Sequence, residues 1–139
     1  MTTSTRVPLM VRVPGMAKGV SKSMVELVDI YPTICDLCGI DAPEQQLDGK
    51  SLTPILRNPS RSVKREVYVQ WQGGDNLQDN RFNYAEWPKS GNAMLFDHKT
   101  DRDENVNVSG KSDYASTVNR MSKDMKKVKK FAFRKKWGK

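Results

Sequence analysis

The spacing of hydrophobic and polar positions changes along the chain, and each spacing predicts a different element. Residues 7–13 (V-P-L-M-V-R-V) form a short, mostly apolar run that is closed by Pro14 and Gly15. Such a run is typical of a strand that is buried on both faces, as in a parallel sheet. No other segment of the chain resembles it. We therefore expect a strand that lacks parallel neighbours within this sequence.

A helix is predicted over residues 30–38. Asp29 can serve as its N-cap, and Pro32 then falls in the first turn, where its missing N–H costs little. A start at Ser23 would place Pro32 inside the helix, at a cost of about 3 kcal/mol. Gly39 is suited to end the helix in a left-handed conformation. The expected apolar face consists of Ile30, Ile34, Leu37 and Cys38.

Residues 41–59 are rich in proline and glycine and predict a loop, with one helical turn around Leu52, Ile55 and Leu56. Three strands joined by turns are predicted next, over residues 66–71, 81–87 and 93–98. The first alternates, with Val67, Val69 and Trp71 on one face. Residues 73–76 (G-G-D-N) are expected to begin a long turn. Consecutive strands of this kind form an antiparallel meander.

A second helix is predicted from residue 113 to about residue 130. Its apolar positions recur every three or four residues, at Tyr114, Val118, Met121, Met125 and Val128. The natural partner of this stripe is one face of the meander. The fold class is therefore α+β: a partial α/β strand–helix piece, then a small antiparallel sheet covered by a C-terminal amphipathic helix. The predicted limits are 1–60, 61–130 and a basic tail over 131–139.

The charge is distributed unevenly. The whole chain carries +8, yet residues 123–139 alone contain nine basic residues and one acid, which is also +8, so residues 1–122 are neutral. A basic patch on a fold favours a polyanionic partner, whereas a basic tail usually serves solubility or is disordered. No apolar run is long enough for a membrane span, and the N-terminus has no signal-peptide pattern, so no membrane partner is expected.

Several residue groups have the composition of a chemical site. Cys35 and Cys38 form a C-x-x-C, but they lie at the C-terminal end of the predicted helix, where the dipole does not favour a thiolate. A zinc site would need two further ligands, and the chain has one histidine, His98, and no third cysteine. We therefore expect free thiols and no metal. An acidic cluster (Asp97, Asp101, Asp103 and Glu104) lacks the pattern of a calcium loop and suits turn formation.

Aromatic residues with Arg81 among them form a further candidate group: Trp71, Phe82, Tyr84 and Trp87. Aromatic side chains on a sheet beside an arginine can stack bases, but cross-strand packing is the more common role. We therefore do not expect a nucleic acid as the partner.

Five stretches together resemble the C-terminal part of the sulfatase family, within the alkaline-phosphatase superfamily, and are most similar to bacterial iduronate-2-sulfatase-like enzymes. These are T-R-V-P-L-M-V-R-V-P-G, V-E-L-V-D-I-Y-P-T-I-C-D-L-C-G-I, L-D-G-K-S-L-T-P-I-L, R-F-N-Y-A-E-W and L-F-D-H-K-T-D-R-D-E-N-V-N. They follow the order and spacing of the family up to about Val128. Arg102 departs from it, because a proline is common at this position.

The resemblance implies a hydrolase of sulfate esters with a formylglycine nucleophile and a calcium ion. In the family these groups precede the segment that begins at Thr5, so we expect no catalytic or metal-binding residue in this chain. The chain alone should therefore be an inactive C-terminal fragment whose partner, in a complete enzyme, is a sulfated glycan. Rim residues for that glycan would be Trp71, Arg81, Trp87 and His98. Two alternatives remain open: a small basic polyanion-binding module, and a degenerate paralogue with a structural role.

Overall fold

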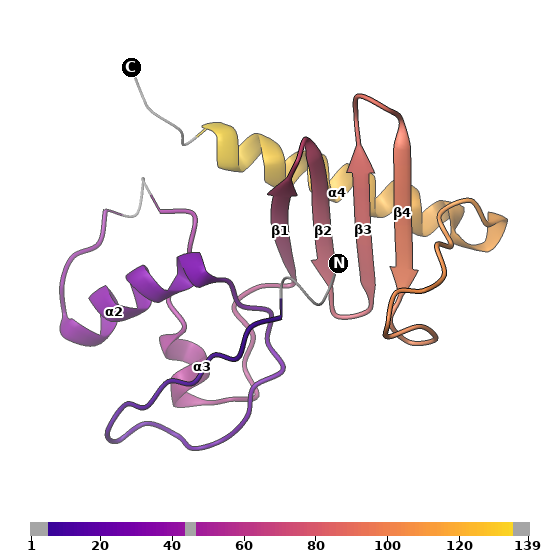
Figure 1. Cartoon of the computed structure of the whole chain (residues 1–139). Coiled ribbons are helices and arrows are strands. Elements are labelled where there is room, and N and C mark those ends of the chain that lie inside the picture. Colours follow the sequence, from indigo (N-terminus) through magenta and orange to yellow (C-terminus); the bar gives the residue numbers. More distant parts are fainter. Residues whose placement is uncertain (1–5, 44–46, 135–139) are drawn as a thin grey trace. The chain divides into compact units, whose positions relative to one another are not determined.

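Four antiparallel strands and one long helix form the C-terminal part of the protein, and short helices form the N-terminal part (Figure 1). The computed structural model describes residues 6–43 and 47–134, and side chains up to residue 129. The described chain divides into two units, essentially residues 9–67 and 68–131. Each unit is described by itself. The domain limits at residues 60 and 130 remain predictions, and residues 135–139 of the basic tail lie outside the described residues.

The sheet has the order β1-β2-β3-β4, which is the meander expected from the sequence. Its strands are β1 (Glu66–Trp71), β2 (Gly74–Asp79), β3 (Phe82–Trp87) and β4 (Asn92–Asp97). The register places Leu77 opposite Tyr84 and Tyr84 opposite Leu95, so these three side chains form a row across the sheet. Three of the strands agree with the predicted ones within a residue.

Strand β2 was not expected, since its sequence G-D-N-L-Q-D predicts a turn. The turn lies one residue earlier, where Gln72 (φ 46°) and Gly73 (φ 75°) form the two-residue connection that a tight hairpin requires. Polar side chains can be buried in this strand because they find partners. The Asn76 amide donates to the Asn83 side-chain oxygen (2.5 Å) and to the Tyr84 carbonyl (3.0 Å).

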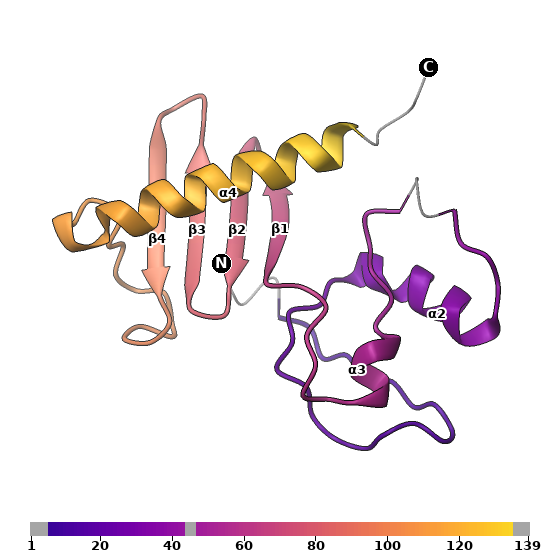
Figure 2. The ribbon, with the colours of Figure 1, turned by 180° about the vertical axis from the view of Figure 1, so that it is seen from behind.

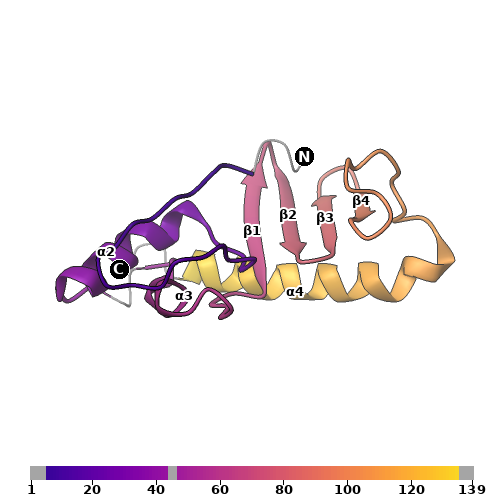
Figure 3. The ribbon, with the colours of Figure 1, turned by 90° about the horizontal axis from the view of Figure 1, so that it is seen from below.

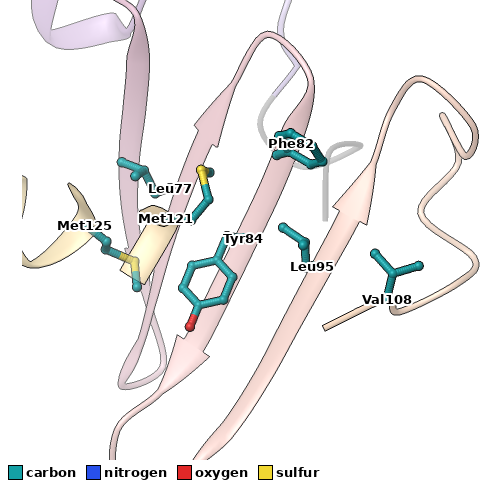
Figure 4. Packing of buried hydrophobic residues seen from close by; sticks show 7 residues of the cluster. All are labelled: Leu77, Phe82, Tyr84, Leu95, Val108, Met121 and Met125. Carbon is teal, nitrogen blue, oxygen red and sulfur yellow. The ribbon is translucent and has the colours of Figure 1, made fainter. Parts of the chain in front are cut away.

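Helix α4 (Ala115–Arg134) follows a short 3-10 turn, η3 (Ser112–Tyr114), and covers one face of the sheet (Figures 2 and 3). The predicted stripe is confirmed. Met121 and Met125 are fully buried, and Tyr114, Val118 and Val128 pack against the same cluster. The core of this unit is Leu77, Phe82, Tyr84, Leu95, Val108, Met121 and Met125 (Figure 4). The two-layer α+β arrangement is therefore the one that the periodicity indicates.

In the other unit, α2 (Ile30–Cys38) has the predicted bounds and ends at Gly39 in the left-handed conformation (φ 66°). A 3-10 turn, η1 (Leu27–Asp29), precedes it. The Asp29 side chain does not cap the helix. It is fully buried, accepts the Glu26 N–H (2.8 Å) and the Lys50 N–H (2.7 Å), and lies 2.7 Å from the Lys64 ammonium.

The predicted apolar face of α2 is wrong. Pro32, Thr33 and Cys35 are buried, while Ile34 is 53% exposed. The Thr33 hydroxyl explains the orientation, because it accepts the Leu52 N–H (2.8 Å) and so fixes this face against the segment that starts helix α3 (Thr53–Arg57). Helix α3 confirms the predicted helical turn, with Leu52 and Ile55 buried.

The predicted strand over residues 7–13 is not formed; this segment has no regular secondary structure, and Met10 is 93% exposed. A single extended segment leaves its N–H and C=O groups without a ladder partner, so it cannot form a sheet alone. The same unit contains a close main-chain approach. A Cβ atom on Gly49 would lie 2.0 Å from the Val28 carbonyl oxygen, so only glycine fits there.

Candidate functional site

The four sequence-predicted rim residues fall at two opposite ends of the sheet. Trp71 and Trp87 end strands β1 and β3, which run in the same direction (Figure 1). Arg81 precedes β3 and His98 follows β4, and the His98 N–H donates to the Arg81 carbonyl (2.8 Å). A strand of six residues spans roughly 20 Å. The structure therefore brings these residues together as two pairs and not as one site.

Arg81 is engaged within the protein. Its Nε and Nη2 donate to the two carboxylate oxygens of Asp97, at 2.9 and 2.6 Å. The Tyr114 hydroxyl donates to the same carboxylate (3.2 Å), and the guanidinium carbon lies 4.6 Å from the centre of the Phe82 ring. The hydrogen bonds from Arg81 lower the pKa of Asp97 to about 2. The fork geometry that could bind an anion thus holds the end of β4 in place.

His98 is also paired. Its Nε2 lies 2.9 Å from Glu104 Oε1, and the Asn83 amide donates to the same oxygen (2.5 Å). The side chains of His98 and Glu104 are only 10% and 4% exposed. Glu104 has a positive φ of 58°, which is uncommon for a residue other than glycine. This constellation fixes the loop after β4, and so the acidic cluster contributes to loop structure, as its turn-rich sequence predicts.

A cavity of about 400 Å³ lies beside the β3–β4 hairpin, at the end of the sheet where Trp87 is found. Its lining combines an indole, two amides and small or apolar groups: Trp87, Ser90, Asn92, Ala93, Met94 and Asn107. The described residues that line it are all uncharged. Such a lining suits a ligand with apolar faces and hydroxyl groups, such as a sugar ring, better than an isolated anion.

Two of the lining side chains, those of Trp87 and Asn107, are held in place by the surrounding chain. The Trp87 indole packs against Gly74 so closely that a Cβ there would lie 2.5 Å from its Nε1. Asn107 is held by the main chain, since its Oδ1 accepts the Leu95 N–H (3.0 Å) and its Nδ2 donates to the Ala93 carbonyl (3.2 Å). Sequence reasoning identified Trp87 but missed the other lining residues. Asn107 lies in the motif E-N-V-N, which was the available signal.

Cys35 is buried, Cys38 is exposed, and both are free thiols. Among the described residues, no group of three or more His, Cys, Asp or Glu side chains is placed to hold a metal ion. None of the described helices is both long and apolar enough to cross a membrane.

Comparison with known proteins places this fold in the class of sulfatase C-terminal domains. Residues 1–131 match the family model described as "N-sulphoglucosamine sulphohydrolase, C-terminal", and the chain belongs to this family. The resemblance to the C-terminal part of the sulfatase family, expected from the sequence, is confirmed.

Two relatives illustrate the similarity in sequence. N-acetylglucosamine-6-sulfatase of Homo sapiens is 46% identical over 77 residues, which are 53% of this chain and 14% of that protein. Ulvan-active sulfatase of Formosa agariphila is 30% identical over 142 residues, 93% of this chain and 27% of that protein.

Solved structures agree in fold. A protein solved with its substrate D-glucosamine-2-N,6-O-disulfate has a TM-score of 0.67 at 20% identity, over 76% of this chain and 24% of that one. A phosphonate monoester hydrolase from Silicibacter pomeroyi has a TM-score of 0.70 at 28% identity, over 84% of this chain and 27% of that one. The chain thus spans between 14% and 27% of the lengths of these relatives.

Proposed function

We propose that this chain forms the C-terminal part of a sulfuric ester hydrolase of sulfated glycans, and that it supplies glycan-binding surface without catalytic groups. The match of residues 1–131 to a sulfatase family carries the proposal. The relatives' names include glucosamine and ulvan sulfatases, which supports sulfated glycans as the substrate class. An iduronate 2-sulfate, implied by the sequence resemblance, is one member of that class.

In this proposal the catalytic formylglycine and the calcium ion belong to residues that this chain does not contain. The two cysteines lie in C-D-L-C, which is not the Cys-x-Pro-x-Arg signature of the nucleophile. We therefore expect the purified chain to show no hydrolysis of an aryl sulfate. Turnover of 4-nitrophenyl sulfate above a buffer control would contradict this part.

The rim candidates enter the proposal unequally. Trp87 offers an indole face in the cavity, whereas Trp71, which is 65% exposed, lies at the same end of the sheet but is not among the lining residues, so we give it no role in binding. Arg81 is paired with Asp97, and His98 is paired with Glu104. We therefore propose that these two residues stabilise the end of β4 and the loop after it. Stacking of a sugar on Trp87 would contribute about 1 kcal/mol, by analogy with other aromatic contacts.

A chimera tests the role of the cavity. Arylsulfatase K of Homo sapiens is 33% identical over 124 residues, so its matching segment can be replaced by this chain. We expect Trp87→Ala to raise KM for a sulfated disaccharide about fivefold while kcat/KM for 4-nitrophenyl sulfate stays unchanged. Trp71→Ala is the matched control, because Trp71 does not line the cavity. Equal losses on both substrates would mean that Trp87 only supports the fold.

A phosphonate ester is the second candidate substrate, because a phosphonate monoester hydrolase shares the fold at 28% identity. The same chimera separates the two by competition for binding and not by hydrolysis of phenyl phosphonate. Since the catalytic groups come from arylsulfatase K, we expect only sulfate hydrolysis there. The assignment of this chain to sulfate or phosphonate then rests on which ligand, sulfated or phosphonylated, competes with the disaccharide for binding.

A further inference from the structure

Helix α4 has two opposite faces of different chemistry. Its apolar stripe packs on the sheet, as described above. Arg120, Lys123 and Lys127 each follow a stripe position by two residues, which is about 200° around the helix axis. Lys123 and Lys127 are exposed, whereas Arg120 reaches back to the sheet, where it pairs with Asp79 of β2 and lies 5.8 Å from the centre of the Phe82 ring. Figure 2 shows the side of the helix that faces away from the sheet. The spacing of basic residues in the sequence continues at Lys130 and Arg134.

The outward side of α4 carries an excess of positive charge. Over residues 115–129 there are five basic residues and a single acid, Asp124. Asp124 lies 2.9 Å from Lys127 and 3.9 Å from Arg120, which also pairs with Asp79. Lys123 and Lys126 are exposed, and neither has an ion pair with another described residue. We call Lys123, Lys126 and Lys127 the lysine face.

Only part of this positive charge is offset by ion pairs within the fold. Lys123 and Lys127 are four residues apart on one helix side, and like charges at that spacing repel and destabilise a helix. Lys129 shows the contrasting case, because it turns towards the sheet and pairs with Asp75 at 2.5 Å. Asp124 offsets the charge of Lys127, and a bound polyanion would supply negative charge to Lys123 and Lys126, which have no ion pair with another described residue.

We propose that the lysine face binds a sulfated glycan chain as a second contact, separate from the Trp87 cavity. The choice of a glycan among polyanions rests on the proposed function. A row of flexible lysines neutralises an extended chain of anions, whereas a single anion is bound more often by an arginine fork. The long ligand is also what gives several weak contacts a high combined affinity.

The test uses the whole chain with heparin as the probe. A triple variant, Lys123→Glu, Lys126→Glu and Lys127→Glu, reverses the lysine face. The matched control reverses three other exposed lysines of the same unit, Lys89, Lys99 and Lys111, and so has the same net charge. We expect heparin affinity to fall at least tenfold in the first variant and less than threefold in the control. The dependence on salt should become shallower only in the first.

Three results would overturn the proposal: no heparin binding by the wild-type chain, equal losses in the two variants, or tighter binding of single-stranded DNA than of heparin at equal salt. A glutamine version of the triple variant keeps the helix propensity and excludes misfolding as the cause, provided that its far-UV circular dichroism is unchanged. Failure here is distinguishable from failure of the proposed function. A chimera that hydrolyses its substrates while the lysine face is reversed without effect on heparin binding would refute this site alone.

Discussion

The Arg81–Asp97 pair allows a quantitative prediction about stability. Asp97 is 1% exposed and accepts four hydrogen bonds, two from Arg81, one from the Tyr114 hydroxyl and one from the Lys99 N–H. Arg81→Ala removes the only positive partner of this carboxylate that the described residues provide. Asp97→Asn removes the charge and leaves an amide that can still accept from Tyr114.

The expected change in the free energy of unfolding follows from the pKa of Asp97. A decrease from the ordinary 3.8 to about 2 is worth about 2 kcal/mol, at roughly 1.4 kcal/mol per pKa unit. Because the pKa is lowered in the folded state, this stabilisation is complete above pH 5 and is lost as the pH falls through about 2. We expect Arg81→Ala to cost less than this whole amount, about 1–2 kcal/mol at pH 7, because Lys99 and Tyr114 also lower the pKa of Asp97 and solvent screens the exposed guanidinium. This is below the value for a fully buried pair, because the Arg81 side chain is 50% exposed.

The assay is urea unfolding followed by tryptophan fluorescence for the wild type, both single variants and the double variant. At pH 7 the double variant should be less destabilised than the sum of the singles, with a coupling of at least about 1 kcal/mol. At pH 2.5 the difference between the wild type and Asp97→Asn should fall below about 1 kcal/mol. Additive losses, or a difference that is the same at both pH values, would refute the assignment of this pair as the clamp of β4.

Two further predictions concern the other unit. Gly49→Ala should destabilise it by about 2 kcal/mol, since the new Cβ meets the Val28 carbonyl oxygen. Gly110→Ala in the sheet unit, where no atom lies within 4 Å, should have little effect; urea unfolding is followed here by far-UV circular dichroism, because residues 9–67 contain no tryptophan. Cys38 is exposed and should react with iodoacetamide in the native protein, whereas Cys35 is buried and should react only on unfolding. Equal alkylation rates of the two thiols, measured by mass spectrometry, would contradict this prediction. Zinc bound in a stoichiometric amount would contradict the prediction of free thiols.

The elements with a regular spacing of apolar residues could be predicted from the sequence. The elements whose burial depends on hydrogen bonds to residues elsewhere in the chain could not. The stripe on α4 repeats every three or four residues over four turns, so the sequence alone indicates which side is buried. For α2 the decisive contact is a hydrogen bond between the Thr33 hydroxyl and the Leu52 N–H, nineteen positions away in sequence, which no local pattern contains. The prediction missed strand β2 for a related reason, because its buried Asn76 is paired with Asn83 from the next strand.

The site could be predicted by residue type but not by arrangement. An indole and a guanidinium are both suited to binding a sulfated sugar. Trp87 ends strand β3 and Arg81 precedes it, so the two side chains lie at opposite ends of the strand and do not form one binding site. The cavity depends on a hairpin and on Asn107, which the main chain positions from a distant loop. Such contacts follow from the register of β3 and β4, and the register is fixed only when the strands pair.

The two proposed glycan contacts differ in their physical origin, and salt can separate them. Stacking on the Trp87 indole buries apolar surface and changes little with ionic strength, whereas binding to the lysine face releases counterions and weakens steeply as salt rises. Trp87→Ala should therefore lower the affinity for a sulfated oligosaccharide by a similar factor at low and high salt. Reversal of the lysine face should lower it at low salt and have little further effect at high salt, where the wild type has already lost that contribution. If both variants followed the same salt dependence, the cavity and the lysine face would not be independent contacts, and one ligand-binding surface would have to account for both.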